Sequence, residues 1–243
     1  MDMSNEKKST QEGKYEDIVT VGFVNPIVNT GIDYAEMGID AFMTNDVIKE
    51  IPIIKTIASV VKVGLSIKEW TFAKKIIKFL EQYHLGYLTE NEKEAFLNKY
   101  QSDTKYKEKI VSFLITINDK YFETKQSEIA GNLFVAYVKG LIDWDTYTII
   151  CGCIDRFSPF ASELLNELEK EKEPYHRGYQ HGTDPRAAVL QSCTFGYQWG
   201  THFFTTPIGI IAHQYGIKAD FNHSVKELYQ IVGFNTSNLD CQK

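Results

Sequence analysis

Apolar residues recur at helical spacing through much of the chain. The pattern predicts helices at about 32–43, 90–100, 104–119 and 123–139. Thr89 is the N-cap candidate for the helix at 90–100, and Glu92 completes a capping box. The apolar positions of the next two helices are Ile110, Phe113, Leu114, Ile117, Ile129, Leu133, Phe134, Tyr137 and Val138. We therefore predict a helical bundle over residues 31–139, preceded by a flexible, polar tail at 1–30.

The segment 51–83 is strongly apolar and yet contains several lysines. Between Pro52 and Ile67, apolar residues surround the predicted helix on nearly all sides. From Lys68 onward the pattern is amphipathic. Its apolar positions are Trp70, Phe72, Ile76 or Ile77, Leu80 and Tyr83, and its lysines are Lys68, Lys74, Lys75 and Lys78. This half resembles helices that bind membrane surfaces, although most such helices pack inside bundles.

The segment is too short and too charged to be a constitutive transmembrane helix. A spanning helix needs ~20 mostly apolar residues, whereas 51–67 is shorter and contains two lysines. Each lysine near the bilayer centre costs roughly 2.5–3.5 kcal/mol. The remaining alternatives are core helices, or a pair sheltered at rest that contacts an anionic membrane when released. In the folded bundle we expect the lysines at 74, 75 and 78 to be solvated. The candidate membrane or partner-binding residues are Ile57, Val60, Val61, Trp70, Phe72, Lys74, Lys75 and Lys78.

The pattern changes after Gly140, a helix-stop signal. Asp143 and Ser158 are N-cap candidates for two further helices. Aromatic and β-branched residues with two glycines then predict one β-hairpin near 188–206, followed by a short helix that Thr206 caps. Helix, helix, hairpin, helix is the order of a winged-helix-like module, which we predict for residues 140–243. The predicted fold is mainly α, with this hairpin as its one substantial β element.

Two motifs connect the chain with a known group of proteins. Residues 51–80 fit the pattern IPI(I/V)…KxGxSIxxxxFxKKxxKFL, and residues 131–157 contain elements of the type GNLFxAYxxGxI…IIDRF. From about 46 to 157 the chain resembles an uncharacterised bacterial family that shares them. The resemblance implies a setting in mobile elements or anti-phage defence and no established activity. A YxxT…G pattern of such proteins is matched at 203–209, with Phe for Tyr and an inserted Pro.

Charge argues against nucleic acid as the main ligand. The net charge is −6, whereas phosphate binding depends on a basic surface. The candidate recognition helix, 158–172, is itself rich in glutamate. We therefore expect no specific nucleic-acid binding. The first residues lack the apolar core of a secretory signal, so we predict a cytoplasmic protein, with peripheral contact to the inner membrane as an alternative.

Enzymatic motifs are lacking, and no cofactor is predicted. The sequence contains no GxxxxGK[ST], GxSxG, HExxH or paired CxxC, and its four cysteines are interpreted mainly as buried thiols. His176, His181 and Asp184 lie close in sequence and are a candidate metal or acid–base site. An ordinary polar loop explains them as well.

Three functions remain as hypotheses. The first is a non-enzymatic defence effector or accessory protein with a membrane-interacting segment. The second is a regulatory protein–protein interaction module of winged-helix type, with a protein partner or a second copy of the chain. The third is an enzyme or metal site around His176 and His181. Tyr197, Trp199 and Phe203 could form an aromatic platform for a ligand or peptide, although hairpin packing also explains them.

Overall fold

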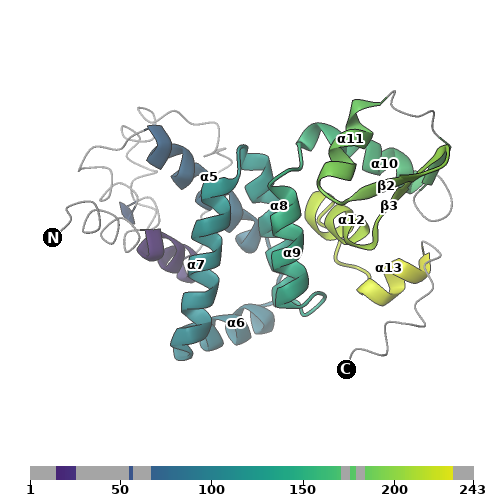
Figure 1. Ribbon diagram of the computed structural model, residues 1–243. Coiled ribbons are helices and arrows are strands. Elements are labelled where there is room, and N and C mark those ends of the chain that lie inside the picture. The colour runs from purple at the N-terminus through teal and green to yellow at the C-terminus, as the bar shows by residue number, and fades with distance from the viewer. Residues whose placement is uncertain (1–14, 26–54, 57–66, 171–175, 179–183, 232–243) are drawn as a thin grey trace. The chain divides into compact units, whose positions relative to one another are not determined.

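The computed structural model describes residues 15–25, 55–56, 67–170, 176–178 and 184–231 (Figure 1). Within them the protein is mainly helical, as predicted, with one small antiparallel sheet. The prediction of a hairpin as the one substantial β element is incomplete, because a third strand at 176–178 pairs with it. The chain divides into two compact units, Met1–Gly131 and Asn132–Lys243. The predicted helix at 32–43 and nearly all of 51–66 lie outside the described residues. The named elements are α5 (Ile67–His84), α6 (Glu90–Ser102), α7 (Thr104–Lys120), α8 (Thr124–Val138), α9 (Trp144–Ile154), η1 (Pro159–Ala161), α10 (Ser162–Lys170), β1 (His176–Gly178), α11 (Pro185–Ser192), β2 (Gly196–Trp199), β3 (His202–Thr205), α12 (Pro207–Ile211), η2 (Ala212–Ile217) and α13 (Val225–Ile231).

The first element that the structure describes is a helix over residues 15–24, where the sequence predicted a tail. Ile18, Val19 and Phe23 are almost completely buried. The Phe23 ring lies 5.1 Å from that of Tyr83 and 5.4 Å from that of Tyr100, both edge-on. Edge-to-face packing of this kind is favourable for aromatic pairs. The tail prediction is therefore wrong for this stretch, which is part of the core.

The amphipathic half of the segment 51–83 is a core helix, α5. Trp70, Phe72 and the other predicted apolar positions are buried. Lys75, which we expected to be solvated, is only 6% exposed, and its Nζ donates a hydrogen bond to the backbone carbonyl of Tyr121. The expectation fails at this position because the aliphatic stem of a lysine can cross apolar surroundings to reach a polar partner.

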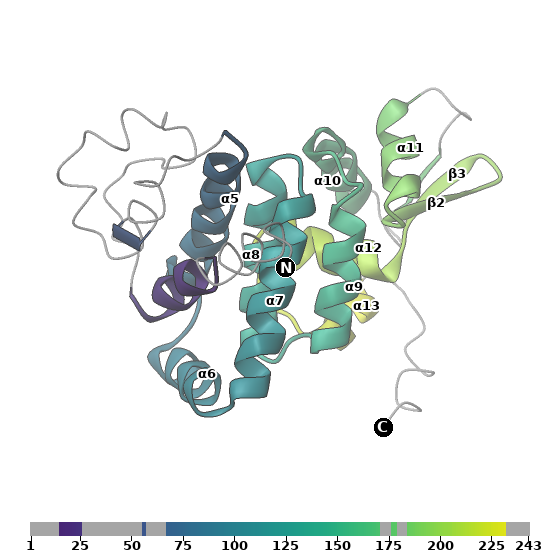
Figure 2. The ribbon, with the colours of Figure 1, turned by 60° about the vertical axis from the view of Figure 1, so that its left-hand side comes forward.

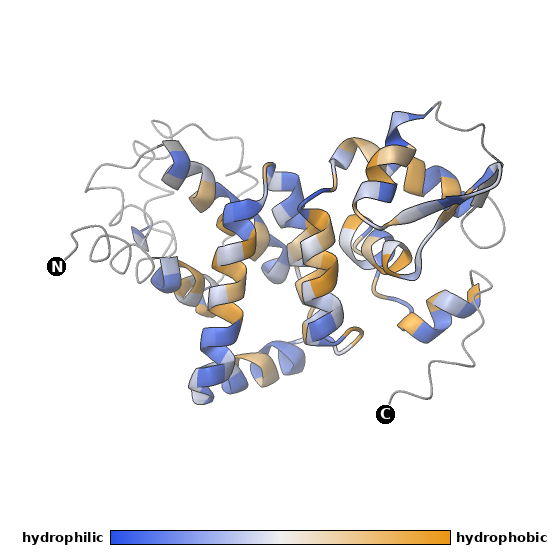
Figure 3. Ribbon diagram, in the orientation of Figure 1, coloured by the Kyte–Doolittle hydropathy of each residue, from blue (hydrophilic) through white to orange (hydrophobic). Residues whose placement is uncertain are grey.

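Helices α6 and α7 confirm the predicted positions to within a few residues. Thr89 caps α6, and the capping box with Glu92 is present in both directions. Asp103 caps α7 by accepting a hydrogen bond from the Tyr106 N–H. Figure 3 shows the resulting amphipathic pattern, since the colour of α7 changes between hydrophobic and hydrophilic around the helix. Its apolar side supplies Ile110 to the core.

The second unit combines helices with a three-stranded antiparallel sheet in the order β1-β3-β2. Asp143 caps α9 as predicted, through a hydrogen bond from the Thr146 N–H. α10 packs against β1 and β3, and α11 packs against β2. Figure 2 shows the β2–β3 hairpin extending beyond the helices of this unit.

The predicted hairpin exists but is shorter than 188–206. Its first part is the end of α11, and the strands occupy only 196–199 and 202–205. A proline at the first helical position and the N-cap Asp184 start α11. The short helix after the hairpin is confirmed, since Thr206 caps α12. It continues as a π-helix, η2, and α13 follows it.

Candidate functional site

An aromatic face of the sheet is the main candidate site. Side chains alternate between the two faces of a strand, and Tyr197 pairs with Phe204 while Trp199 pairs with His202. All four therefore share one face. Tyr197 and Phe204 are stacked, with centroids 5.3 Å apart and planes 19° apart, and the His202 ring lies 6.2 Å from that of Phe204. We call these four residues the aromatic face.

The aromatic face is accessible to a ligand. Trp199 is 77% exposed and Tyr197 is 44% exposed. Large aromatic side chains bury 150–250 Å² each when they are covered, so this exposure leaves much apolar surface in water. Gly196–Thr205 contains no lysine, arginine, aspartate or glutamate. The face is thus aromatic, and His202 is the one basic residue among its four members.

Phe203, predicted as part of the platform, lies on the opposite face. It is 1% exposed, and a Cβ at Gly196 would stand 2.4 Å from its ring. The Phe203 ring therefore occupies space that is open only because Gly196 has no side chain. Phe204 takes the place that the prediction gave to Phe203.

The base of the hairpin is held by a compact set of hydrogen bonds. The Thr206 hydroxyl donates to the Thr194 carbonyl at 2.6 Å, and the Thr206 N–H donates to the Phe195 carbonyl at 3.0 Å. Thr194 has a φ of 67°, which is unfavourable for a β-branched residue. At the other end, Gly200 has a φ of 60°, as tight hairpin turns require at this position. These features give the aromatic face a defined support.

A polar cluster joins α10 to the π-helix η2. The Gln214 amide and the Lys218 ammonium donate to the same Glu169 oxygen, at 2.7 and 2.6 Å. The His213 ring nitrogen Nε2 donates to the Asn166 Oδ1 at 2.8 Å. Because α10 also packs on β1 and β3, the cluster fixes the helix that lies against the sheet.

The ionisation of this cluster suits a structural role. Burial lowers the pKa of His213 to about 4, although the Glu169 carboxylate partly opposes the change. Burial raises the pKa of Glu169, but hydrogen bonds from Lys218 and Gln214 outweigh it, so the net shift is downward. The histidine is therefore neutral at pH 7, and a pKa near 4 is poorly matched to proton transfer at that pH.

The predicted metal or acid–base site is only partly visible. His181 lies outside the described residues, and His176 is placed by its backbone, which pairs with Phe204. The Asp184 carboxylate accepts a hydrogen bond from the Arg186 N–H at 2.9 Å and forms an ion pair with its guanidinium at 2.7 Å. Arg186 also reaches Glu167 at 2.8 Å. Asp184 thus caps α11, and Arg186 joins α11 to α10 through Glu167. In the part of the chain that the structure describes, no three His, Cys, Asp or Glu side chains are placed to hold a metal.

The structure describes some of the predicted membrane-binding residues, and their environments differ. Ile57, Val60 and Val61 lie outside the described residues. Trp70 and Phe72 are buried, and Lys74 stands over the Trp70 ring at 5.7 Å. Lys78 forms an ion pair with Glu81 at 3.2 Å, with about a fifth of its side chain exposed. In the described ranges, no helix combines the length and the apolar character that crossing a bilayer requires.

Comparisons with known proteins found no matching family model, curated protein or solved structure. The resemblance to a bacterial family therefore stays a prediction.

The three-residue platform predicted from the sequence leaves out two members of the aromatic face, His202 and Phe204, although both lie in the same aromatic stretch. The signal was present, because a two-residue turn at 200–201 dictates the pairing of the residues on either side. The polar cluster had no comparable signal, since its residues are more than 40 positions apart in sequence.

Proposed function

We propose that the Asn132–Lys243 unit is a protein-interaction module whose aromatic face docks an extended, proline-rich segment of a partner protein. The observation that carries the proposal is the exposure of Trp199 on a well-supported hairpin. An exposed tryptophan is a large apolar surface, and such residues dominate binding energy when a partner covers them.

The charge of this unit favours an uncharged protein segment over nucleic acid. Residues 132–243 contain nine Lys and Arg and twelve Asp and Glu. Aromatic platforms that bind single-stranded nucleic acid combine stacking with a cationic groove. The strands of the hairpin contribute no lysine or arginine, so phosphate groups would have no cationic contact from β2 and β3.

The chemistry of the aromatic face points to a polyproline II segment. Such segments are preformed, contain few backbone donors and bind grooves lined by aromatic side chains. Tyr197 and Trp199 are two residues apart on one strand, so a segment lying across β2 could contact both rings. Because the ligand loses little conformational entropy, a small aromatic surface is sufficient for weak and specific binding.

A regulatory module of winged-helix type belongs to the same proposal. The order α10, α11, β2–β3 hairpin, α12 supports it, as does the packing of both helices on the sheet. The glutamates of α10 argue that such a module recognises protein. A setting in bacterial defence, which the sequence resemblance implies, is compatible with this role.

The test is titration of the full chain with decaproline, followed by tryptophan fluorescence and calorimetry. We expect saturable binding with a Kd of about 10 µM to 1 mM, the range of small and weak recognition surfaces. Trp199→Ala should weaken binding at least about tenfold, because it removes the main contact. A Gly-Ser peptide of equal length should not bind.

Phe160→Ala is the matched control, because Phe160 is also exposed, at 58%, and belongs to the same unit. It should leave decaproline binding unchanged. The proposal is refuted if decaproline does not bind the wild-type protein, or if the substitutions at 160 and 199 weaken it equally. Tighter binding of oligothymidine than of decaproline would replace it with a nucleic-acid function.

A further inference from the structure

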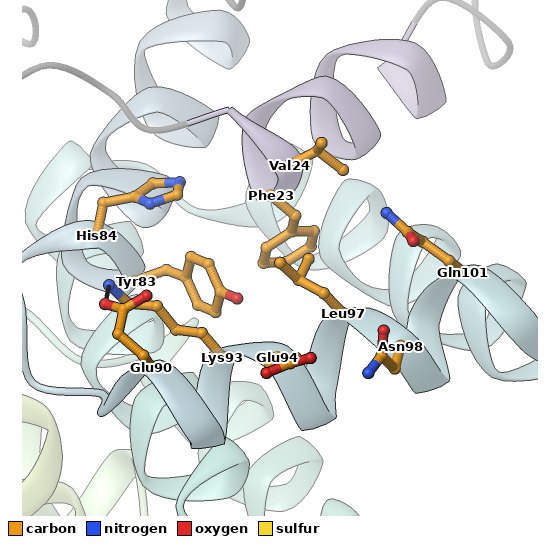
Figure 4. A pocket seen from close by; sticks show the side chains of 10 residues that line it. All are labelled: Phe23, Val24, Tyr83, His84, Glu90, Lys93, Glu94, Leu97, Asn98 and Gln101. Carbon is orange, nitrogen blue, oxygen red and sulfur yellow. Dashed lines mark hydrogen bonds and ion pairs between the residues drawn. The ribbon is translucent and has the colours of Figure 1, made fainter.

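A pocket of about 500 Å³ lies in the first unit. Its lining residues are distant in sequence from those that the proposed function uses. Its walls come from the helix over residues 15–24, the end of α5 and one side of α6. Figure 4 shows the rings of Phe23 and Tyr83 directed into it, with His84 at one end and Gln101 at the other. This volume falls in the range of small-molecule sites.

The floor of the pocket is rigid and aromatic. Phe23 and Tyr83 are each 1% exposed and pack edge-on with centroids 5.1 Å apart. His84 fixes the end of α5 to the neighbouring helix, since its Nε2 lies 2.7 Å from the Gly22 carbonyl oxygen. Burial lowers the pKa of His84, so its ring is neutral at pH 7. The apolar side chain of Leu97 extends this floor along α6.

The rim of the pocket carries an excess of negative charge. Lys93 is already paired with Glu90, with its Nζ 3.4 Å from the carboxylate. The carboxylate of Glu94, the next acidic residue on this wall, forms no hydrogen bond or ion pair with another residue that the structure describes. Asn98 and Gln101 follow it at i+4 and i+7, so their amides lie on the same side of α6. With His84 neutral, Glu94 is the uncompensated charge of the pocket.

We propose that this pocket binds a small organic amine with an aromatic or aliphatic body, whose ammonium group pairs with Glu94 and whose body lies against Leu97 and the aromatic floor. The charge of the rim selects a cation. An anion of the same size meets the Glu94 carboxylate instead and is rejected.

Phenethylamine and hydrocinnamate are the probes, because they have the same ring and similar length but opposite charge. Each is titrated into the full chain at pH 7 by calorimetry and by amide NMR. We expect phenethylamine to bind with a Kd on the order of 1 mM or tighter and to shift the amide signals of α6. Hydrocinnamate should bind at least about tenfold more weakly, since it places like charges together.

Three variants separate the site from general charge effects. Glu94→Gln should weaken phenethylamine binding roughly fivefold, because it removes a partly solvated ion pair. Glu108→Gln, on exposed α7 surface outside the pocket, is the matched control and should change nothing. Asn98→Trp, which adds a bulky ring at the wall, should abolish binding while the thermal midpoint stays near that of the wild type.

The proposal is overturned by three results. They are equal binding of the two probes, an unchanged Kd in Glu94→Gln, and no saturable binding of phenethylamine at 10 mM, about ten times the expected limit. Since Trp199 belongs to neither the pocket nor α6, the decaproline experiment can fail or succeed independently of this one.

Discussion

The second unit should lose stability as the pH falls from 7 to 5, because His213 binds a proton more readily in the unfolded chain than in the folded one. The pKa of this side chain is about 4 in the folded protein, against an ordinary value of 6.5, because burial disfavours the charged form. A base whose pKa is lower in the folded than in the unfolded chain contributes its full stabilisation at pH values above the unfolded pKa. That stability is lost as the pH falls toward the folded pKa, because the unfolded chain then binds a proton that the folded chain does not.

The two pKa values give the size of the effect. Between pH 7 and pH 5 the contribution of His213 to the free energy of unfolding should fall by about 2 kcal/mol. Glu169 also has a lowered pKa, but its ordinary value of 4.5 places its contribution mainly below pH 5. Within the second unit, the comparison of pH 7 with pH 5 therefore reports chiefly on His213. His84, whose pKa burial also lowers, lies in the first unit.

The assay is urea unfolding at the two pH values, followed by tryptophan fluorescence, with Trp144 as a reporter in the same unit. His213→Gln keeps a side-chain N–H that can donate to Asn166 but removes the titratable ring. This variant should lose about 2 kcal/mol less than the wild type between pH 7 and pH 5. His202→Gln, on the exposed hairpin, should behave like the wild type. Equal losses in the wild type and His213→Gln would refute the reasoning.

Three further substitutions should lower the free energy of unfolding, measured by urea titration at pH 7. Gly209→Ala should cost about 1–3 kcal/mol, because its Cβ would stand 2.2 Å from the Phe195 carbonyl oxygen. A cost below about 0.5 kcal/mol, as is usual for a surface substitution, would contradict this geometry. Lys75→Gln should cost about 1–3 kcal/mol, because it leaves the buried Tyr121 carbonyl without its donor. As the control, Lys74→Gln should change stability by less than about 0.5 kcal/mol. Equal effects of the two substitutions would mean that the buried hydrogen bond contributes nothing. Thr89→Ala should cost about 1 kcal/mol through loss of the capping box, and an unchanged midpoint would show that this helix end is already frayed.

Helices with strong local signals could be predicted from the sequence. At α6 and α9 the start is specified by Thr89 and Asp143, each with a side-chain oxygen that accepts an N–H three residues later. The information lies within four residues, so tertiary contacts add little to the boundary. The apolar stripe of α7 likewise appears at a period that only a helix can bury on one side.

Elements that depend on distant partners were harder to predict. The helix over residues 15–24 is rich in β-branched residues and follows a polar stretch, so its sequence favours no helix. It forms against Tyr83 and Tyr100, which are about 60 and 80 residues away. Similarly, α11 was assigned to the hairpin because its apolar residues have no clear helical period, and its cap Asp184 was interpreted as a possible metal ligand.

The candidate sites show the same division. Alternation along two strands joined by a two-residue turn would have placed Phe204 beside Tyr197, so the aromatic face could have been derived in full. The pocket proposed to bind an amine could not have been derived in this way, because Phe23 and Leu97 come from helices whose packing has no local signal. Charge patterns were also ambiguous, since Lys75 has the same sequence context as Lys74 but a buried environment.

The burial of α5 sets a condition on any membrane contact by this segment. Its large buried side chains are Trp70, Phe72, Ile76, Ile77, Phe79, Leu80 and Tyr83. At about 1.5–3 kcal/mol for each, exposing them would cost roughly 10–20 kcal/mol, which equals or exceeds the net stability of a typical domain. α5 therefore cannot leave the bundle while the rest of the Met1–Gly131 unit stays folded. A membrane that bound α5 would have to take up the same apolar surface and would abolish the pocket that α5 helps to form, so membrane binding and amine binding in this unit should exclude each other.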